Sequence, residues 1–297
     1  MPVHELAALG AAACWAVTGI LAPGPIAHLG ALAFNRWRQV FATLMFAAIV
    51  LASGTWRQLD AATVVPLVFS GLIGIFLGDS LLFTAVGRIG PRRAGVLFAL
   101  NAPVAALLGW LVLGETLGAA AIGGIALTVA GVSLAILYGR GRAPGHALEA
   151  VRGSLIVGIA AGLGAATGQA TGSLIARPVM AAGFDPFAAS LLRVVVAAAG
   201  LALLMRLPLA GIPQPRPMTP RVATLTALTA FLGLGVGMTL VLFALAGGKV
   251  GIVSTLSATS PVLILPLLWL VTGQRPSGGA WAGAALVVAG MALIFLR

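Results

Sequence analysis

Residues 94–113 of the chain read AGVLFALNAPVAALLGWLVL, an uncharged and mostly apolar stretch. About 20 apolar residues in a helix cross the hydrocarbon core of a bilayer, so this stretch predicts a transmembrane helix. Comparable stretches lie on both sides of it. The ten predicted spans cover Leu6–Ala22, Ala31–Ala52, Val64–Val86, Ala94–Leu113, Ala119–Leu137, Leu155–Ala176, Pro186–Met205, Val222–Ala246, Val250–Thr272 and Ala280–Leu296. The sequence therefore predicts an all-α integral membrane protein with ten transmembrane helices in a lipid bilayer.

The composition agrees with this fold class. Hydrophobic residues make up 60% of the chain and charged residues 8%, whereas soluble domains carry about 25% charged residues. The formal net charge is +11, which in a soluble protein would suggest nucleic-acid binding. Here the arginines lie singly or in pairs between apolar stretches, where they orient helices in the membrane. We therefore expect no nucleic-acid partner.

The second half of the chain repeats the first from the third predicted span onward. One constant shift superposes Gly74 on Gly233, Gly78 on Gly237, Trp110 on Trp269, Gly124 on Gly283, and Val129-Ala130-Gly131 on Val288-Ala289-Gly290. Five crossings per repeat reverse the direction of the second repeat. This predicts two inverted five-helix repeats with a substrate site near the midplane between them. The predicted units are a first repeat at 1–138, a linker at 139–152 and a second repeat at 153–297.

Basic residues between the spans are distributed unequally over the two sides of the predicted bundle. One side carries Arg88, Arg92, Arg93, Arg140, Arg142, Arg152, Arg206, Arg216, Arg221 and Arg275, and the other carries Arg57, Arg177, Lys249 and Arg297. Loops rich in Lys and Arg face the cytoplasm, so this bias places both termini outside it. We expect a multi-pass protein of the cell inner (plasma) membrane in this orientation.

Asp79 is a carboxylate well inside the third predicted span. An ionised carboxylate is costly in hydrocarbon and usually faces a cavity, a partner or a proton path. Asp79 is therefore a candidate for proton coupling or for binding a substrate amine. The alternative is a salt bridge or hydrogen bond to an arginine or a helix end. Its counterpart under the repeat shift is Met238, so either role is confined to one repeat.

Three arginines lie about two turns into their predicted helices: Arg36, Arg38 and Arg193. Long arginines near helix ends can extend to the membrane interface. Alternatively, one of them binds a substrate carboxylate, because the planar guanidinium suits bidentate contacts. Arg36 and Arg38 are two positions apart on one helix, so they point to different faces and should not share a role.

Prolines occur at matching places in the fourth and ninth predicted spans. Pro103 follows Asn101 by two positions, and Pro261 follows Thr259 and Ser260. A proline removes an intrahelical hydrogen bond and can bend the helix, which leaves a carbonyl free near a cavity. We expect Pro103 and Pro261 to be hinges and Asn101 to lie on a cavity wall; harmless kinks are the alternative.

Other polar and aromatic residues within the spans supply further cavity candidates. Gln169 is the largest polar side chain of the sixth span, and Ser257 lies among the hydroxyl residues of the ninth. Trp15, with Thr18 one turn later, could form an aromatic wall. The alternative for all four is helix packing, because small and hydroxyl residues commonly join membrane helices.

Residues for enzyme chemistry or cofactor binding are not apparent. The single cysteine, Cys14, excludes an intrachain disulfide and a cysteine-based metal site. His4, His28 and His146 lie at ends or in loops without metal-ligand spacing. The glycines follow no soluble strand and no Gly-Lys-Ser/Thr signature occurs, so nucleotide binding is not expected. We expect no enzyme, no metal and no cofactor.

Three segments of the first half carry a family resemblance: Gly78-Asp79-Ser80-Leu81-Leu82-Phe83-Thr84-Ala85, Asn101-Ala102-Pro103-Val104 and Leu113-Gly114-Glu115-Thr116-Leu117. Together with Arg38 and Arg193 in the second helix of each repeat, they resemble the EamA-type ten-helix branch of the drug/metabolite transporter superfamily. The second half departs from the family pattern, because it reads Gly273-Gln274 where the family often keeps Gly-Glu.

The resemblance implies a secondary transporter that exports small metabolites, with amino acids favoured, by alternating access through a cavity between the repeats. The first, third and fourth helices and their repeat equivalents are expected to line it, with Asp79 as the proton-coupling candidate. Fold alone does not fix the substrate, so a lipid-linked sugar flippase and an exporter of other metabolites or drugs stay as alternatives. An integral-membrane enzyme is the alternative from another class.

Overall fold

The computed structural model describes residues 3–138, 154–206, 216–272 and 275–295, and the regular structure of these residues is helical. The predicted linker at 139–152 lies outside the described residues. The first half contains α1 (Val3–Leu21), α2 (Pro23–Leu29), α3 (Ala31–Ser53), η1 (Thr55–Gln58), α4 (Ala61–Ser70), η2 (Gly71–Leu77), α5 (Gly78–Ala99), α6 (Asn101–Leu113) and α7 (Ala119–Tyr138). The second contains α8 (Leu155–Ala181), α9 (Pro186–Leu204), α10 (Pro220–Thr229), η4 (Ala230–Met238), α11 (Thr239–Gly247), α12 (Val250–Ser257), α13 (Ser260–Thr272) and α14 (Gly278–Phe295).

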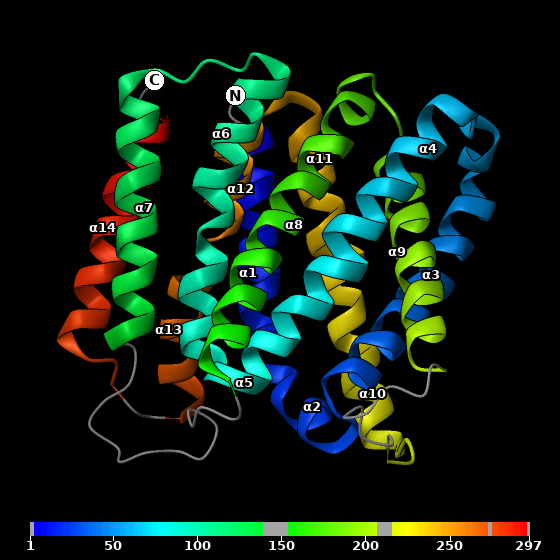
Figure 1. Cartoon of the computed structure of the whole chain (residues 1–297), viewed down its shortest axis with the longest axis horizontal. Coiled ribbons are helices and arrows are strands. Elements are labelled where there is room, and N and C mark those ends of the chain that lie inside the picture. The colour runs from blue at the N-terminus through cyan, green and yellow to red at the C-terminus, as the bar shows by residue number, and fades with distance from the viewer. Residues whose placement is uncertain (1–2, 139–153, 207–215, 273–274, 296–297) are drawn as a thin grey trace.

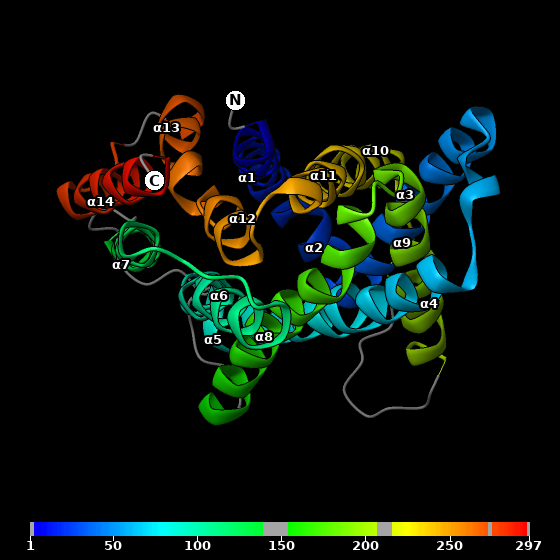
Figure 2. The same ribbon diagram turned by 90° about the horizontal axis from the view of Figure 1, so that it is seen from above.

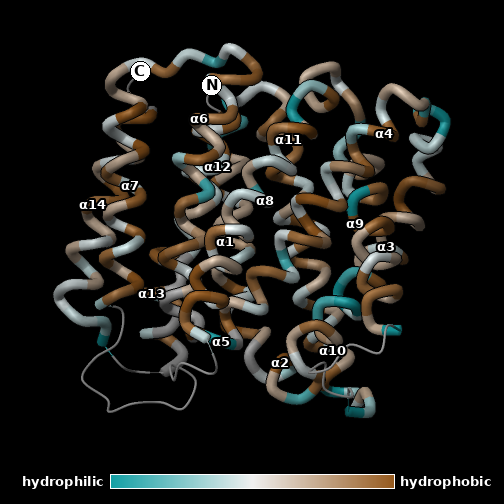
Figure 3. The backbone as a smooth tube through the Cα atoms, viewed as in Figure 1, coloured by the Kyte–Doolittle hydropathy of each residue, from teal (hydrophilic) through white to brown (hydrophobic). Residues whose placement is uncertain are grey.

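The helices run up and down one bundle, and the start of α1 and the end of α14 lie at the same end of it (Figure 1). Within the described residues, seven helical segments are long and apolar enough to cross a membrane: Val3–Leu21, Ala61–Val86, Ala94–Leu113, Ala119–Tyr138, Leu155–Ala181, Pro186–Leu204 and Pro220–Gly247. Apolar colours dominate along these helices in Figure 3, and hydrophilic colours occupy short stretches. The predicted class, an all-α integral membrane protein, is confirmed.

The other three predicted spans are shorter as single helices, or less hydrophobic, than these seven, for reasons that their sequences show. The helix α3 is 23 residues long but carries Arg36 and Arg38 beside the buried Asn35 and Gln39. The ninth predicted span is divided into α12 and α13, and α14 forms a shorter apolar helix over Gly278–Ile294. The count of ten crossings therefore stays a prediction for these three segments.

The two halves share backbone features that identify them as structural repeats. The π-helical segments η2 and η4 begin at Gly71 and Ala230, and the shift that superposes Gly74 on Gly233 superposes these starts too. Gly30 and Gly183, which precede the second long helix of each half, have φ angles of 80° and 83°. A side chain is disfavoured at such angles, so glycine is needed at both connections.

The contacts between α7 and α14 show how the repeats are related. A Cβ at Gly124 would lie 2.6 Å from the Gly290 carbonyl oxygen, and a Cβ at Gly131 would lie 2.6 Å from the Gly283 carbonyl oxygen. Since Gly124 corresponds to Gly283 and Gly131 to Gly290, the two contacts are reciprocal, as a two-fold relation between inverted repeats requires. Small residues allow these helices to approach closely. Figure 2 shows α7 and α14 side by side at one edge of the bundle.

Other helices of the two halves also pack against each other: α3 lies against α9, and α5 lies against α8. The helix α1 contacts η4, α11, α12 and α13 of the second half. The repeats are therefore interlocked, and the space between them is enclosed by helices of both.

Pro23-Gly24-Pro25 follow α1 and begin the short helix α2, because proline suits the first helical turn. One local prediction needs correction. The predicted bends at Pro103 and Pro261 are instead interruptions that precede the prolines, at Leu100 and at Ala258–Thr259. Both prolines lie in the first turn of a new helix, where the missing N–H group costs nothing. Their role as hinges stays a prediction.

Candidate substrate cavity

A cavity of about 340 Å³ lies between the two repeats. Its walls come from α1, α3, η2 and α5 of the first half, and from α8, α9, α10, η4, α11 and α13 of the second. A smaller cavity of about 70 Å³ shares Trp15, Phe98 and Gln169 with it. The sequence predicts walls from the first, third and fourth helices of each repeat. The second helix of each repeat, α3 or α9, lines the cavity as well.

The structure brings the eight predicted cavity residues to these two cavities. The larger one is lined by Trp15, Thr18, Arg38, Asp79, Gln169 and Arg193. The smaller one is lined by Trp15, Asn101, Gln169 and Ser257. Arg36 is absent from both linings and lies 5.5 Å from the Trp37 ring centre, which fits the prediction that it and Arg38 occupy different faces. Whether the cavities bind a substrate stays a prediction.

The two cavity arginines occupy equivalent places. Arg38 comes from α3 and Arg193 from α9, the second long helix of each half. Each rests against a π-helical glycine of the opposite half: a Cβ at Gly233 would lie 3.1 Å from Arg38 Nη2, and a Cβ at Gly74 would lie 3.2 Å from Arg193 Nη2. The glycines leave room for the guanidinium groups, and the sequence alone did not indicate this pairing.

Asp79 lies in the first turn of α5, and its carboxylate interacts electrostatically with both Arg38 and Arg193. Among the described residues that line the cavity, these three are the charged ones, so the cavity carries one excess positive charge. Arg193 is only 3% exposed. The Nε atoms of both arginines are buried and find no hydrogen-bond partner in the described part of the chain. Both arginines line the cavity, so their guanidinium groups are the strong donors that a ligand there would meet.

The aromatic wall is fixed by one hydrogen bond across the repeats. Trp15 Nε1 donates to the carbonyl oxygen of Gly233 at 2.8 Å, inside the π-helical segment η4. π-Helical segments frequently accompany functional sites. The guanidinium of Arg38 lies 5.5 Å from the Phe34 ring centre, a cation–π distance. The Thr18 hydroxyl donates to the Trp15 carbonyl at 2.9 Å within α1, so its proton is already used.

The helix interruptions position the polar residues of the smaller cavity. Asn101, the first residue of α6, donates from Nδ2 to the Phe98 carbonyl at 2.9 Å across the break at Leu100. Ser257, the last residue of α12, donates to the Ser254 carbonyl at 3.2 Å. Both side chains therefore satisfy backbone groups at helix ends.

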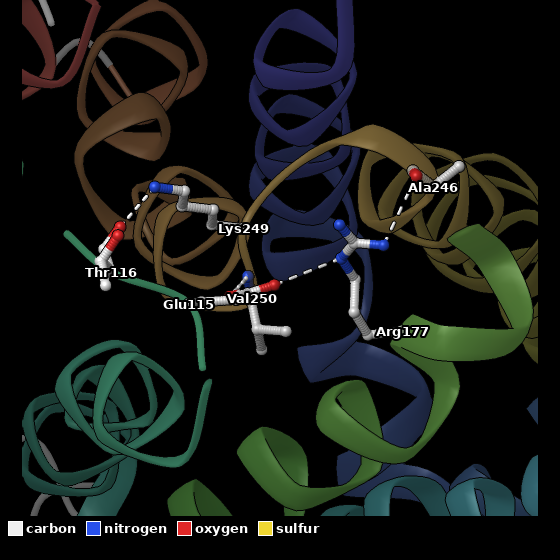
Figure 4. Close-up of polar contacts among 6 residues, drawn as sticks. All are labelled: Glu115, Thr116, Arg177, Ala246, Lys249 and Val250. Atoms are coloured by element: carbon white, nitrogen blue, oxygen red, sulfur yellow. Dashed lines mark hydrogen bonds and ion pairs between the residues drawn. The ribbon is translucent and has the colours of Figure 1, made fainter. Parts of the chain in front are cut away.

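A second group of charged residues lies at the end of the bundle where α1 begins (Figures 1 and 4). Glu115 Oε2 accepts from the Val250 backbone N–H at 2.8 Å, and Glu115 Oε1 lies 3.4 Å from Arg177 Nε. Arg177 Nη1 donates to the Ala246 carbonyl at 3.5 Å, and Lys249 Nζ donates to the Thr116 carbonyl. We call these residues the end cluster. It joins the loop after α6 to the second repeat, a contact that the Glu115 motif alone did not predict.

Potential metal ligands do not gather in the described residues: no three of His, Cys, Asp and Glu come together there. His146 lies outside the described residues. Cys14 is partly buried on α1.

These features define a class: a multi-pass helical membrane protein whose two inverted repeats enclose a charged cavity. The chain belongs to the EamA-like transporter family, whose model matches residues 3–137 and 156–296. The predicted resemblance of the chain to this family is thereby confirmed. Transport, and not an enzyme reaction, is the activity that the family name describes.

Two individual comparisons agree with this assignment. An "uncharacterized transporter" of Archaeoglobus fulgidus is 30% identical over 141 residues, which are 46% of this chain and 48% of that protein. The chain thus spans about half the length of the curated relative it matches. A solved structure described as "Crystal structure of protein" superposes with a TM-score of 0.79 at 22% identity, covering 99% of this chain and 96% of that one. At this identity the likeness concerns the fold alone.

Proposed function

We propose that the protein is a secondary transporter of the inner (plasma) membrane that exports small metabolites, amino acids above all, through the cavity between its repeats. The observation that carries the proposal is the cavity of about 340 Å³ with charged groups from both repeats, in a member of a transporter family. Pockets for small molecules start at about 300 Å³ and combine apolar walls with a few polar groups. An amino acid fits such a volume better than a lipid-linked sugar does.

Alternating access is part of the proposal, and contacts between the repeats occur at both ends of the bundle. At the end opposite the start of α1, His28 Nε2 lies 2.9 Å from the Pro217 carbonyl oxygen (Figure 1). The end cluster ties the repeats together where α1 begins. The cavity residues of α1, Trp15, Thr18 and Ala22, belong to its second half or follow it, away from that end. With the orientation that the charge bias predicts, the end cluster faces away from the cytoplasm.

Proton coupling through Asp79 is part of the proposal. Its carboxylate is the acid among the described lining residues, and it lies in the field of two arginines. Asp79→Asn removes the titratable group with little change of size. If protons drive export through this group, the variant loses the stimulation of transport by an imposed pH gradient. Transport by Asp79→Asn that still responds fully to the gradient would remove Asp79 from the coupling step.

The experiment that tests the proposed function is counterflow uptake into proteoliposomes with a panel of labelled amino acids. Wild type, Gln169→Ala and Arg36→Gln are compared, the last as a control outside the cavities. Saturable exchange that Gln169→Ala weakens and Arg36→Gln leaves intact is the expected result. Absence of exchange for every amino acid would contradict the amino-acid assignment and would redirect the search to sugars, nucleotides or lipid-linked substrates.

A further inference from the structure

The most unusual polar feature of the cavity is a pair of arginines from opposite repeats with unused donors. Arg38 and Arg193 approach the cavity from α3 and α9, and each has a buried Nε without a hydrogen-bond partner among the described residues. A buried donor without a partner is costly, and a buried charge without a full set of partners is more so. A ligand that offers acceptors would satisfy such groups.

The charge balance indicates what kind of ligand this is. Asp79 interacts with both arginines and compensates one positive charge, which leaves one positive charge uncompensated among the described lining residues. A solute with a net charge of −1 would neutralise the cavity, whereas a neutral zwitterion would leave the excess unchanged. In a poorly solvated cavity this difference is amplified, because charges interact more strongly at low dielectric constant.

Both guanidinium groups line the same cavity, and one carboxylate, Asp79, already interacts electrostatically with each of them. Arginine presents its donors in a planar fork that matches the two oxygens of a carboxylate, which lysine does not. The lack of a side chain at Gly233 leaves room for Arg38 Nη2 to lie against the second repeat. Gly74 does the same for Arg193 Nη2 and the first repeat. Arg193 is nearly fully buried, so it cannot extend to the membrane interface, the alternative considered from the sequence.

We propose that Arg38 and Arg193 together form a binding site for one carboxylate, with Asp79 as its resident competitor, so that the cavity prefers solutes of net negative charge. Among amino acids the preferred substrates are then the acidic ones. The inference rests on the proposed function and names its substrate class. The position equivalent to Asp79 is occupied by Met238, which also lines the cavity. The first repeat alone therefore supplies a carboxylate at this position to compete with the substrate.

Counterflow with matched pairs of solutes tests the charge preference. The pairs are glutamate and glutamine, and lactate and lactamide, whose members differ mainly in charge. The proteins are wild type, Arg38→Lys, Arg193→Lys and the control Arg36→Lys, each checked for a monodisperse peak by size-exclusion chromatography. Wild type is expected to prefer the charged member of a transported pair by at least about tenfold, since hydrogen bonds to charged groups are strong.

The lysine variants separate binding from folding, because they keep the charge and lose the fork. We expect Arg38→Lys and Arg193→Lys to weaken the transport of glutamate and of lactate by roughly tenfold, and Arg36→Lys to have no effect. Equal transport of glutamate and glutamine by wild type would overturn the inference and leave the proposed function standing. Transport of lactate without transport of any amino acid would support the charge preference and contradict the proposed export of amino acids. Absence of flux for every solute would contradict both.

Discussion

The protein contains two groups of charged residues that join its repeats, and they differ in how completely they are partnered. In the end cluster, Glu115 accepts from a backbone N–H group and pairs with Arg177, which in turn reaches a carbonyl. In the cavity, Arg38 and Arg193 share one carboxylate, Asp79, and their buried Nε atoms have no hydrogen-bond partner among the described residues; Arg177 Nε has none either, but it lies 3.4 Å from Glu115 Oε1. The end cluster thus pairs its acid with a neighbouring cation and stabilises one conformation, whereas the cavity has one carboxylate for two cations and can accept a second from a ligand. The first is suited to closing an end and the second to binding.

The largest effect should come from removing both cavity cations. The double variant Arg38→Gln/Arg193→Gln deletes both charge-assisted contacts to the substrate, so counterflow of the preferred anionic amino acid should fall by at least about a hundredfold. The measurement is the initial rate in proteoliposomes at equal protein content. A double variant that retains most of the wild-type rate would remove the arginines from the binding site.

A smaller effect is expected from filling the space beside Arg38. In Gly233→Ala the new Cβ would lie 3.1 Å from Arg38 Nη2 and 3.3 Å from Thr18 Cγ2, so the guanidinium must move. Apparent affinity for the preferred solute should weaken by roughly three- to tenfold. The matched control is Gly118→Ala, because a Cβ there has nothing within 4 Å. Equal affinities for the two variants would show that Arg38 needs no fixed position.

The end cluster should respond differently, since it acts on conformation and not on binding. Glu115→Gln keeps an acceptor for the Val250 N–H but loses the ion pair with Arg177, which should raise the population open at this end by roughly two- to fivefold. A cysteine at Ser254 of the smaller cavity, in a Cys14→Ala background, reports this opening through its rate of maleimide labelling. A slower or unchanged rate would contradict the role of the cluster.

The smallest effect concerns a charged group outside both clusters. Asp60 caps α4, with its Oδ1 accepting from the Thr63 N–H at 2.8 Å, and hydrogen bonds from the Thr63 side chain and backbone lower the pKa of the Asp60 carboxyl. A lowered pKa stabilises the fold above the ordinary carboxyl range, and this stabilisation is lost as the pH falls through the lowered pKa. Asp60→Ala should therefore lower Tm by about 1–2 °C at neutral pH, and by less in acid.

Thermal unfolding in detergent at several pH values checks this prediction. Asp60→Asn is the matched control, because asparagine caps helices without a charge. A Tm difference that grows on acidification would contradict the assignment of the pKa shift.

Much of the fold was predictable because it depends on local composition. Apolar length located Ala94–Leu113 and Ala119–Leu137, and the periodic glycines Gly124 and Gly131 revealed the repeat. What the sequence could not supply is contact between distant segments. The interruptions at Leu100 and Ala258 depend on how the repeats pack, because proline at Pro103 is compatible with both a kink and a new helix.

The same distinction holds for the candidate site. Asp79, Arg38 and Arg193 stand out in apolar spans, so residue type alone selected them. Their mutual arrangement, and the placement of Gly233 beside Arg38, required the three-dimensional structure. The partnership of Glu115 with Arg177 was equally hidden, since these residues belong to different repeats.

The measurement that tests the central claim most directly is equilibrium binding of labelled glutamate and glutamine to purified wild type and Asp79→Asn. If Asp79 competes with the substrate carboxylate for the two arginines, Asp79→Asn should bind glutamate roughly tenfold more tightly and should not weaken the binding of glutamine. If Asp79 instead holds the substrate amine, the same substitution should weaken the binding of both. Weaker glutamate binding by Asp79→Asn would contradict the account of the cavity as an anion site with a resident competitor.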